Sequence, residues 1–117
     1  MNKYRDKSDF EINKAVFHAA RIKHKWFKFL PHGVVTYNIK GDWVIFDPCN
    51  KPADAMPIII ENKICMAYDV FAEERDGGSW VAQPAYGFSN ERVRSDNYYR
   101  SAMICFLMMK DAENEKS

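Results

Sequence analysis

The sequence predicts an α+β fold, in which a four-stranded, mainly antiparallel sheet packs against about three helices in one small domain. The length of 117 residues is close to the commonest size of a single domain, so residues 1–117 are expected to share one core. Hydrophobic residues make up 47% of the chain and aromatic residues 15%, which is enough to build that core. Helix-like and strand-like patterns follow one another in the order α-β-β-α-β-β-α.

The first helix is expected to begin at Ser8. A stripe of apolar residues then recurs with helical spacing, at Ile12, Ala15, Val16, Ala19 and Ala20. The Ser8 side chain can cap the helix, and Glu11, three residues later, can accept a hydrogen bond from the Ser8 backbone N–H. This capping box fixes the start of the helix, and we expect its end near Ile22 or Lys25.

Four segments have the β-branched and aromatic composition of strands, and they form two candidate hairpins. Segments 34–39 and 43–46 are separated by a short glycine-containing turn. Segments 64–71 and 79–88 are separated by residues 72–78, which carry several charges and two adjacent glycines. We expect this second loop to be exposed and mobile.

Segment 46–57 is the most distinctive part of the chain, because it contains three prolines, two carboxylates and an asparagine. Pro57 would disrupt a continuous helix that began at Asn50. We therefore expect two shorter pieces, one turn capped by Asn50 and a second helix capped by Asp54, with Pro57 in its third position. The rigid segment would present an outward polar surface without a reaction centre.

The last helix contains residues 102–109, which are apolar on every face of the helix. Such a helix is usually central and buried. The charged end of the chain, residues 111–117, and the start, residues 1–7, are expected to fray.

Net charge, cysteine spacing and apolar runs narrow the possible functions and indicate the cellular compartment of the protein. The formal net charge is +1, which provides no global field for nucleic acid or an anionic membrane. Cys49, Cys65 and Cys105 form no CxxC pair, so neither a disulfide framework nor a zinc site is expected. The start does not resemble a signal peptide, and the longest apolar run is too short to span a bilayer. The sequence therefore predicts a soluble protein of the cytoplasm, with no cofactor.

Three segments carry a resemblance to a known family. They are Ser8-Asp9-Phe10-Glu11-Ile12-Asn13, Phe46-Asp47-Pro48-Cys49-Asn50 with the following Pro52-Ala53-Asp54-Ala55 and Pro57-Ile58-Ile59, and Arg100 with Ala102-Met103-Ile104 and Phe106-Leu107-Met108-Met109. In this order they resemble the NinX-like family of lambdoid phages and enterobacterial prophages, a family without an established biochemical activity. The resemblance implies a phage or prophage accessory protein that works in the bacterial host cell.

The chain departs from the family pattern at three places. Met56 stands where a Trp is common, Tyr98 stands where a Pro often follows Asn97, and the basic stretch around 21–28 is longer. The Met at position 56 removes the aromatic docking role that a Trp there would have.

Asp47, Asn50 and Asp54 are the candidate partner-binding residues. Their carboxylates and amide lie close together in sequence and could form a recognition surface for another protein, which is the favoured function. The alternative is structural, because Asp before Pro, Asn before a turn and Asp at a helix start are residues that Asx-turns and helix caps require. The sequence leaves both interpretations open.

A second functional alternative is nucleic-acid binding through a stretch that mixes cations with aromatic rings. Its candidate residues are Arg21, Lys23, Lys25, Trp26 and Lys28, to which Arg92, Arg94 and Arg100 could add. The same pattern arises when aromatic side chains close a core and lysines solvate its edge.

An enzymatic function finds less support in the sequence. Cys49 could act as a nucleophile with His18, His24 or His32 as base, yet no spacing is diagnostic of a catalytic site. We therefore expect a binding protein rather than an enzyme, with a homodimer as an additional option because strand edges are exposed.

Overall fold

The computed structural model describes residues 3–20, 27–30, 34–85 and 92–115, with the backbone alone described for residues 27–30, 34, 39 and 115. The helices are α1 (Asp9–Ala19), α2 (Pro52–Glu61) and α3 (Tyr98–Glu115), with a short 3-10 helix η1 (Glu74–Asp76). The strands are β1 (Phe27–Leu30), β2 (Val34–Ile39), β3 (Asp42–Phe46), β4 (Ile64–Tyr68), β5 (Trp80–Pro84) and β6 (Val93–Ser95). The α+β class is confirmed.

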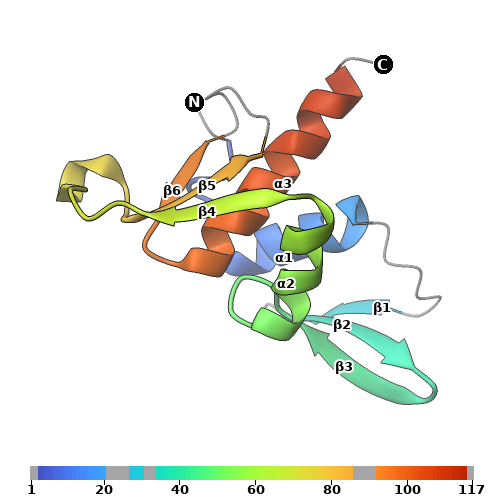
Figure 1. The fold of residues 1–117 in the computed structure, drawn as a ribbon. Coiled ribbons are helices and arrows are strands. Elements are labelled where there is room, and N and C mark those ends of the chain that lie inside the picture. Colours follow the sequence, from blue (N-terminus) through green and yellow to red (C-terminus); the bar gives the residue numbers. More distant parts are fainter. Residues whose placement is uncertain (1–2, 21–26, 31–33, 86–91, 116–117) are drawn as a thin grey trace.

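The described strands form two separate antiparallel sheets, in the orders β1-β2-β3 and β4-β5-β6, so the expectation of one four-stranded sheet is wrong. Both predicted hairpins exist, with Val35 opposite Phe46 in one and Met66 opposite Ala82 in the other. Each hairpin gains a third short strand instead of joining the other. Because β3 leads directly into α2 and α2 into β4, the helix stands between the sheets (Figure 1).

Helix α1 begins as the sequence predicts. The Ser8 hydroxyl accepts a hydrogen bond from the Glu11 backbone N–H at 3.1 Å, and the Glu11 carboxylate accepts one from the Ser8 backbone N–H. The hydrogen bond from Ser8 holds the pKa of Glu11 below its ordinary value. The helix ends at Ala19, several residues before the expected end, and residues 21–25 lie outside the described part of the chain.

Helix α2 is continuous from Pro52 to Glu61, so the prediction of two shorter pieces is wrong. Pro52 occupies the first position, where its fixed φ suits a helix and its missing N–H is not needed. Pro57 removes the hydrogen bond to the Ala53 carbonyl. Both Ala53 and Pro57 are exposed, which lets solvent satisfy that carbonyl, so the helix tolerates the proline.

Helix α3 is the centre of the core. It contacts α1, α2 and all three strands of the second sheet. Residues 102–107 are all buried, as the apolar run predicts, and Phe106 and Met103 are among the largest fully buried side chains. Cys105 and Cys49 are buried, whereas Cys65 is exposed on β4.

Both segments that were expected to fray, residues 1–7 and 111–117, make tertiary contacts. Tyr4 is buried, and its hydroxyl donates a hydrogen bond of 2.6 Å to the Asp111 carboxylate. Burial, with this hydrogen bond, raises the pKa of Tyr4 well above its ordinary value. Helix α3 continues to Glu115. Within the described ranges, no helix has the length and apolar content to cross a bilayer.

Candidate functional site

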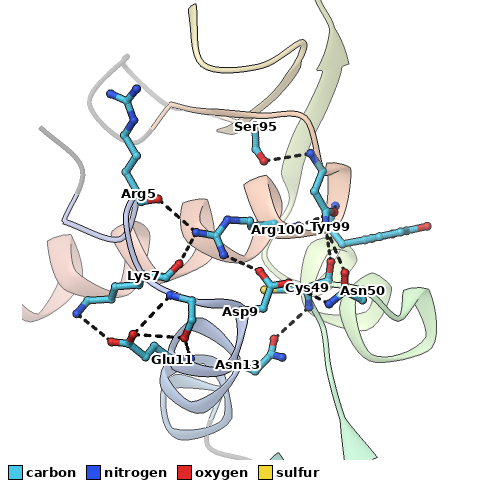
Figure 2. Close-up of polar contacts among 12 residues, drawn as sticks. Arg5, Lys7, Asp9, Glu11, Asn13, Cys49, Asn50, Ser95, Tyr99 and Arg100 are labelled. Atoms are coloured by element: carbon cyan, nitrogen blue, oxygen red, sulfur yellow. Dashed lines mark hydrogen bonds and ion pairs between the residues drawn. The ribbon is translucent and has the colours of Figure 1, made fainter. Parts of the chain in front are cut away.

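The three predicted partner-binding residues belong to a larger polar network, which we call the polar clamp. Its members come from α1, the loop 47–51, α2 and the start of α3, and they are Asp9, Asn13, Asp47, Asn50, Asp54, Asn97 and Arg100. Figure 2 shows several of these side chains converging between α1, the loop and α3. The clamp joins segments that are far apart in the sequence.

Asn13 holds the loop against α1. Its amide Nδ2 donates to Asp47 Oδ1 at 2.7 Å, and its Oδ1 accepts from the Cys49 backbone N–H at 3.1 Å. Asp9 lies one helical turn earlier, so both side chains face the same loop. Asn13 is only 5% exposed, and this double contact satisfies a polar side chain that would otherwise be costly to bury.

Asp54 and Asn50 complete the loop side of the clamp. The Asp54 carboxylate, in the first turn of α2, accepts a hydrogen bond of 2.9 Å from the Asp47 backbone N–H. The Asn50 amide donates to the Asp9 carboxylate at 3.1 Å and to both Asp47 carboxylate oxygens. Asp54 therefore ties the loop to α2, while Asn50 ties it to α1.

Asn97 and Arg100 connect the clamp to α3. Asn97 caps α3, because its Oδ1 accepts from the Tyr99 and Arg100 backbone N–H groups, and its amide donates to the Cys49 carbonyl at 2.9 Å. The Arg100 guanidinium donates to Asp9 Oδ1 at 2.6 Å and to the Lys7 carbonyl. Asn97 thus ties the start of α3 to the loop 47–51, and Arg100 ties α3 to the N-terminal segment.

Cys49 lies within the clamp and is fully buried. Burial, followed by the negative charge of Asp9, raises the pKa of the Cys49 thiol far above its ordinary value. A thiol in this environment stays protonated, whereas a cysteine nucleophile requires the thiolate. The surroundings of Cys49 are those of a core residue.

The structure brings Asp47, Asn50 and Asp54 together, and each makes an internal hydrogen bond. The cavity beside them, lined by residues such as Phe10 and Ile45, has a volume of about 160 Å³. This is below the roughly 300–1,000 Å³ of typical ligand pockets. In the described ranges, no group of three or more His, Cys, Asp or Glu side chains is placed to hold a metal ion.

The nucleic-acid candidates fall mostly beyond the described residues. Arg21, Lys23, Lys25 and Trp26 lie outside them, and Lys28 is placed only as a backbone position of β1, opposite Thr36. Their predicted role stays a prediction.

A second candidate site is the loop between β4 and β5, residues 69–79, which we call the projecting tip. Figure 1 shows this segment in yellow, extending beyond the body of the molecule at the end of the second sheet. Val70 is 72% exposed and Phe71 is 88% exposed, while Tyr68 at its base is 55% exposed. Three large apolar side chains therefore face solvent at one place.

Asp69 fixes the turn that carries Val70 and Phe71. Its carboxylate Oδ1 accepts from the Phe71 backbone N–H at 2.9 Å, and its carbonyl accepts from the Ala72 N–H at 3.2 Å. The Asp69 N–H donates to the Ser79 carbonyl across the loop at 2.8 Å. The turn is thus an Asx-turn anchored on both sides of the hairpin.

An ion pair joins the tip to β6. Arg94 donates to Asp69 Oδ2 at 2.9 Å and to the Gly78 carbonyl at 3.4 Å. The hydrogen bond from Phe71 and then the Arg94 guanidinium hold the pKa of Asp69 below its ordinary value of 3.8. The carboxylate is therefore charged, and able to hold the turn, at neutral pH.

Glycine and aromatic packing hold the base of the tip. Gly78 has φ +139°, and a Cβ there would lie 2.2 Å from the backbone carbonyl carbon of Ser95. The Trp80 ring packs edge-on against Tyr68 and Tyr98, with both centroid separations 4.9 Å. The loop that the sequence predicted to be mobile is held by backbone, carboxylate and ring contacts.

Sequence reasoning missed the tip because Val70 and Phe71 continue the β-like run that starts at Ile64. The strand ends at Tyr68, so the two residues fall in a turn instead of a buried strand. Asp69 gave a signal, since an Asp two residues before Phe71 can accept from its N–H and initiate a turn. Apolar residues after such an Asp, followed by the charged run 73–76, indicate exposure.

The described residues therefore form a small α+β protein with an internally satisfied polar network and an exposed apolar tip. The family model described as "Bacteriophage P22, NinX" matches residues 3–110, and the chain belongs to this phage protein family. The comparisons with curated proteins and with solved structures gave no match to the chain.

Proposed function

We propose that this phage protein acts by binding another protein, and that the projecting tip is the docking element. The observation that carries the proposal is the exposure of Val70 and Phe71, 72% and 88%, on a turn fixed by Asp69. Exposed apolar residues scattered singly are ordinary, but adjacent ones on a projecting turn mark an interaction site.

The rigidity of the turn supports binding. Ordering a flexible loop on association costs free energy, and a turn already held by Asp69, Arg94 and Gly78 avoids much of that cost. Phe71 would serve as the central anchor, because aromatic side chains that fill a pocket contribute much of the energy of an interface.

Charge next to the tip indicates the chemistry of the partner. Glu73, Glu74 and Asp76 follow Phe71 after one alanine, and Arg75 among them pairs with Glu73 at 3.0 Å. These carboxylates would be repelled by an anionic membrane surface. A protein pocket with an apolar floor and basic rim is complementary to the tip in both respects.

The polar clamp supports this function indirectly. Asp47, Asn50 and Asp54 were expected to bind the partner themselves, and each is also engaged inside the protein. In our proposal they hold the three helices in place, and recognition occurs at the tip. Substitutions at the two places should therefore have different consequences.

The test is affinity capture from cells infected by a phage that carries the chain, with wild type compared to the double variant Val70→Ser, Phe71→Ser. We expect wild type to retain a partner that the double variant loses. Both replaced side chains are exposed, so the stability should change by no more than about 0.5 kcal/mol. A photo-crosslinking residue at position 71 should attach to an apolar pocket flanked by Lys or Arg on that partner.

Ile60→Ser is the matched control. Ile60 is 68% exposed, but it lies on α2 and not on the tip, so its replacement should leave capture unchanged. Equal capture by the tip variant and wild type would refute the proposal. Crosslinks from position 71 to lipid, or to a second copy of the chain, would also contradict it.

A further inference from the structure

A groove at the back of the tip concentrates arginines from three segments of the chain. It has a volume of about 390 Å³, within the roughly 300–1,000 Å³ of ligand sites. Arg5 comes from the N-terminal turns, Arg92 and Arg94 from the region of β6, and Arg100 from α3. Four of the six arginines in the chain therefore line one groove.

Two of these arginines are oriented by internal carboxylates. Arg94 pairs with Asp69, and Arg100 pairs with Asp9. Their side chains are only 24% and 19% exposed. They are part of the protein's own framework, and the two carboxylates balance their charge.

The other two are exposed. Within the described part of the chain, the guanidinium groups of Arg5 and Arg92 make no hydrogen bond or ion pair, and Arg92 interacts with the Asp69 carboxylate through its charge alone. In Figure 2 the Arg5 side chain is extended, with its guanidinium pointing away from the contact that its own carbonyl makes with Arg100. Such groups are available to a ligand.

The acidic side chains of the groove are fewer. Among the described residues of the lining, Asp6 and Asp76 are the acidic ones, beside four arginines of which Arg94 and Arg100 pair with Asp69 and Asp9. The Asp76 carboxylate already accepts a hydrogen bond of 2.7 Å from the Glu73 backbone N–H. Arg5 and Arg92 are therefore the groove arginines whose charge is not taken up by an ion pair within the described residues.

We propose that this groove binds the phosphate backbone of double-stranded nucleic acid through Arg5 and Arg92. The planar guanidinium matches the geometry of phosphate oxygens and can bind two of them at once. Among the described residues of the lining, Val93 and Ile104 are the apolar side chains, and none is an aromatic ring on which an unpaired base could stack. This composition favours backbone contact with a duplex over recognition of single strands.

The experiment measures fluorescence anisotropy of a labelled DNA duplex titrated with the purified full chain. Affinity should fall about ten- to forty-fold between ~50 and ~200 mM salt, as expected when two or three phosphates are neutralised. The double variant Arg5→Gln, Arg92→Gln should bind roughly tenfold more weakly for each arginine removed at ~50 mM salt, with a shallower salt dependence.

Arg75→Gln is the matched control, because Arg75 is 81% exposed and lies outside the groove. Arg75→Gln removes one positive charge, as each substitution of the double variant does. It should leave duplex affinity within about twofold of wild type, because Arg75 makes no phosphate contact in the proposed complex. The tip variant Val70→Ser, Phe71→Ser should also bind the duplex normally. Duplex binding and partner capture can therefore fail independently.

Several outcomes would overturn the inference. Absence of duplex binding at ~50 mM salt would do so, and equal affinity of wild type and the Arg5/Arg92 double variant would assign binding to another surface. Tighter binding of a single-stranded oligonucleotide, a phosphotyrosine peptide or inorganic phosphate than of the duplex would contradict the stated ligand.

Discussion

The loop 47–51, which the polar clamp holds, and the projecting tip orient their apolar residues in opposite directions. In the clamp, Pro48 and Cys49 are fully buried against the helices. In the tip, Val70 and Phe71 face solvent. In both places a carboxylate accepts a hydrogen bond from a backbone N–H. Asp54 accepts from Asp47 in the loop, and Asp69 accepts from Phe71 in the tip. The same local chemistry therefore closes the core in one place and displays apolar surface in the other.

What differs is the structure behind each loop. The clamp lies between α1, α2 and the start of α3, so its side chains find partners on three elements. The tip extends past the end of β4 and β5 and is held at its base alone (Figure 1). Rigidity without surrounding packing leaves apolar residues exposed, which is the arrangement of a docking element.

The two regions meet at the start of α3. Asn97 donates to the Cys49 carbonyl of the clamp and its backbone N–H donates to Ser95 at the end of β6. Tyr98 packs against Trp80, which in turn packs against Tyr68 at the base of the tip. Substitutions that affect one region and not the other therefore distinguish their roles.

Gly78→Ala should have the largest effect on stability, about 3 kcal/mol or more, because the new Cβ would collide with the Ser95 backbone. Gly41→Ala is the control, since Gly41 also has a positive φ, +95°, but open space around it. That change should cost only about 1–2 kcal/mol. Urea unfolding of both variants measures the difference, and equal losses would show that the tip does not pack on β6 as described.

Asn13→Ala should destabilise the fold by about 2–3 kcal/mol, because it leaves the Cys49 N–H buried without an acceptor. Asn38→Ala provides the comparison. Asn38 accepts from the Gly41 N–H in an exposed turn, and its loss should cost at most about 1 kcal/mol. Thermal or urea unfolding gives both values, and an unchanged stability of Asn13→Ala would argue against the clamp as a structural device.

Asp54→Ala should cost about 1–2 kcal/mol, since the Asp47 N–H loses its acceptor, and Asp54→Asn should recover most of this loss because it keeps an oxygen. Partner capture by the folded variants should equal that of wild type. If Asp54→Ala kept its stability but lost the partner, Asp54 would be a recognition residue and the structural role assigned to it would be wrong.

Arg94→Gln should have the smallest effect on global stability, because the ion pair with Asp69 is only partly buried and solvent screens it. The pKa of Asp69 should rise toward 3.8 but stay below it, since the hydrogen bond from Phe71 remains. A lowered pKa means that the carboxylate's contribution is present above 3.8 and is lost as pH falls through the folded-state value. NMR titration of Asp69 tests this, and an unchanged pKa would contradict the contact.

Much of the local structure could be predicted from particular residues. Ser8 and Glu11 give the start of α1, and the apolar run 102–109 gives a buried helix, because caps and helical periodicity are local signals. The sequence analysis did not predict strands β1 and β6. Residues 93–95 of β6 contain one apolar residue, and this strand depends on its pairing with β5. The three residues Asp47, Asn50 and Asp54 were identified together, but their partners Asn13 and Asn97 were not, because those contacts span 34 to 48 residues.

The sequence by itself determined the α+β class, the two hairpins, the capped first helix and the membership of the chain in its phage family. These depend on neighbours within a few residues or on residue order. The tertiary structure alone decided that the hairpins form two sheets and that Phe71 lies outside the core. Whether a side chain is buried depends on which distant segment packs over it, and no segment of the described chain covers the tip.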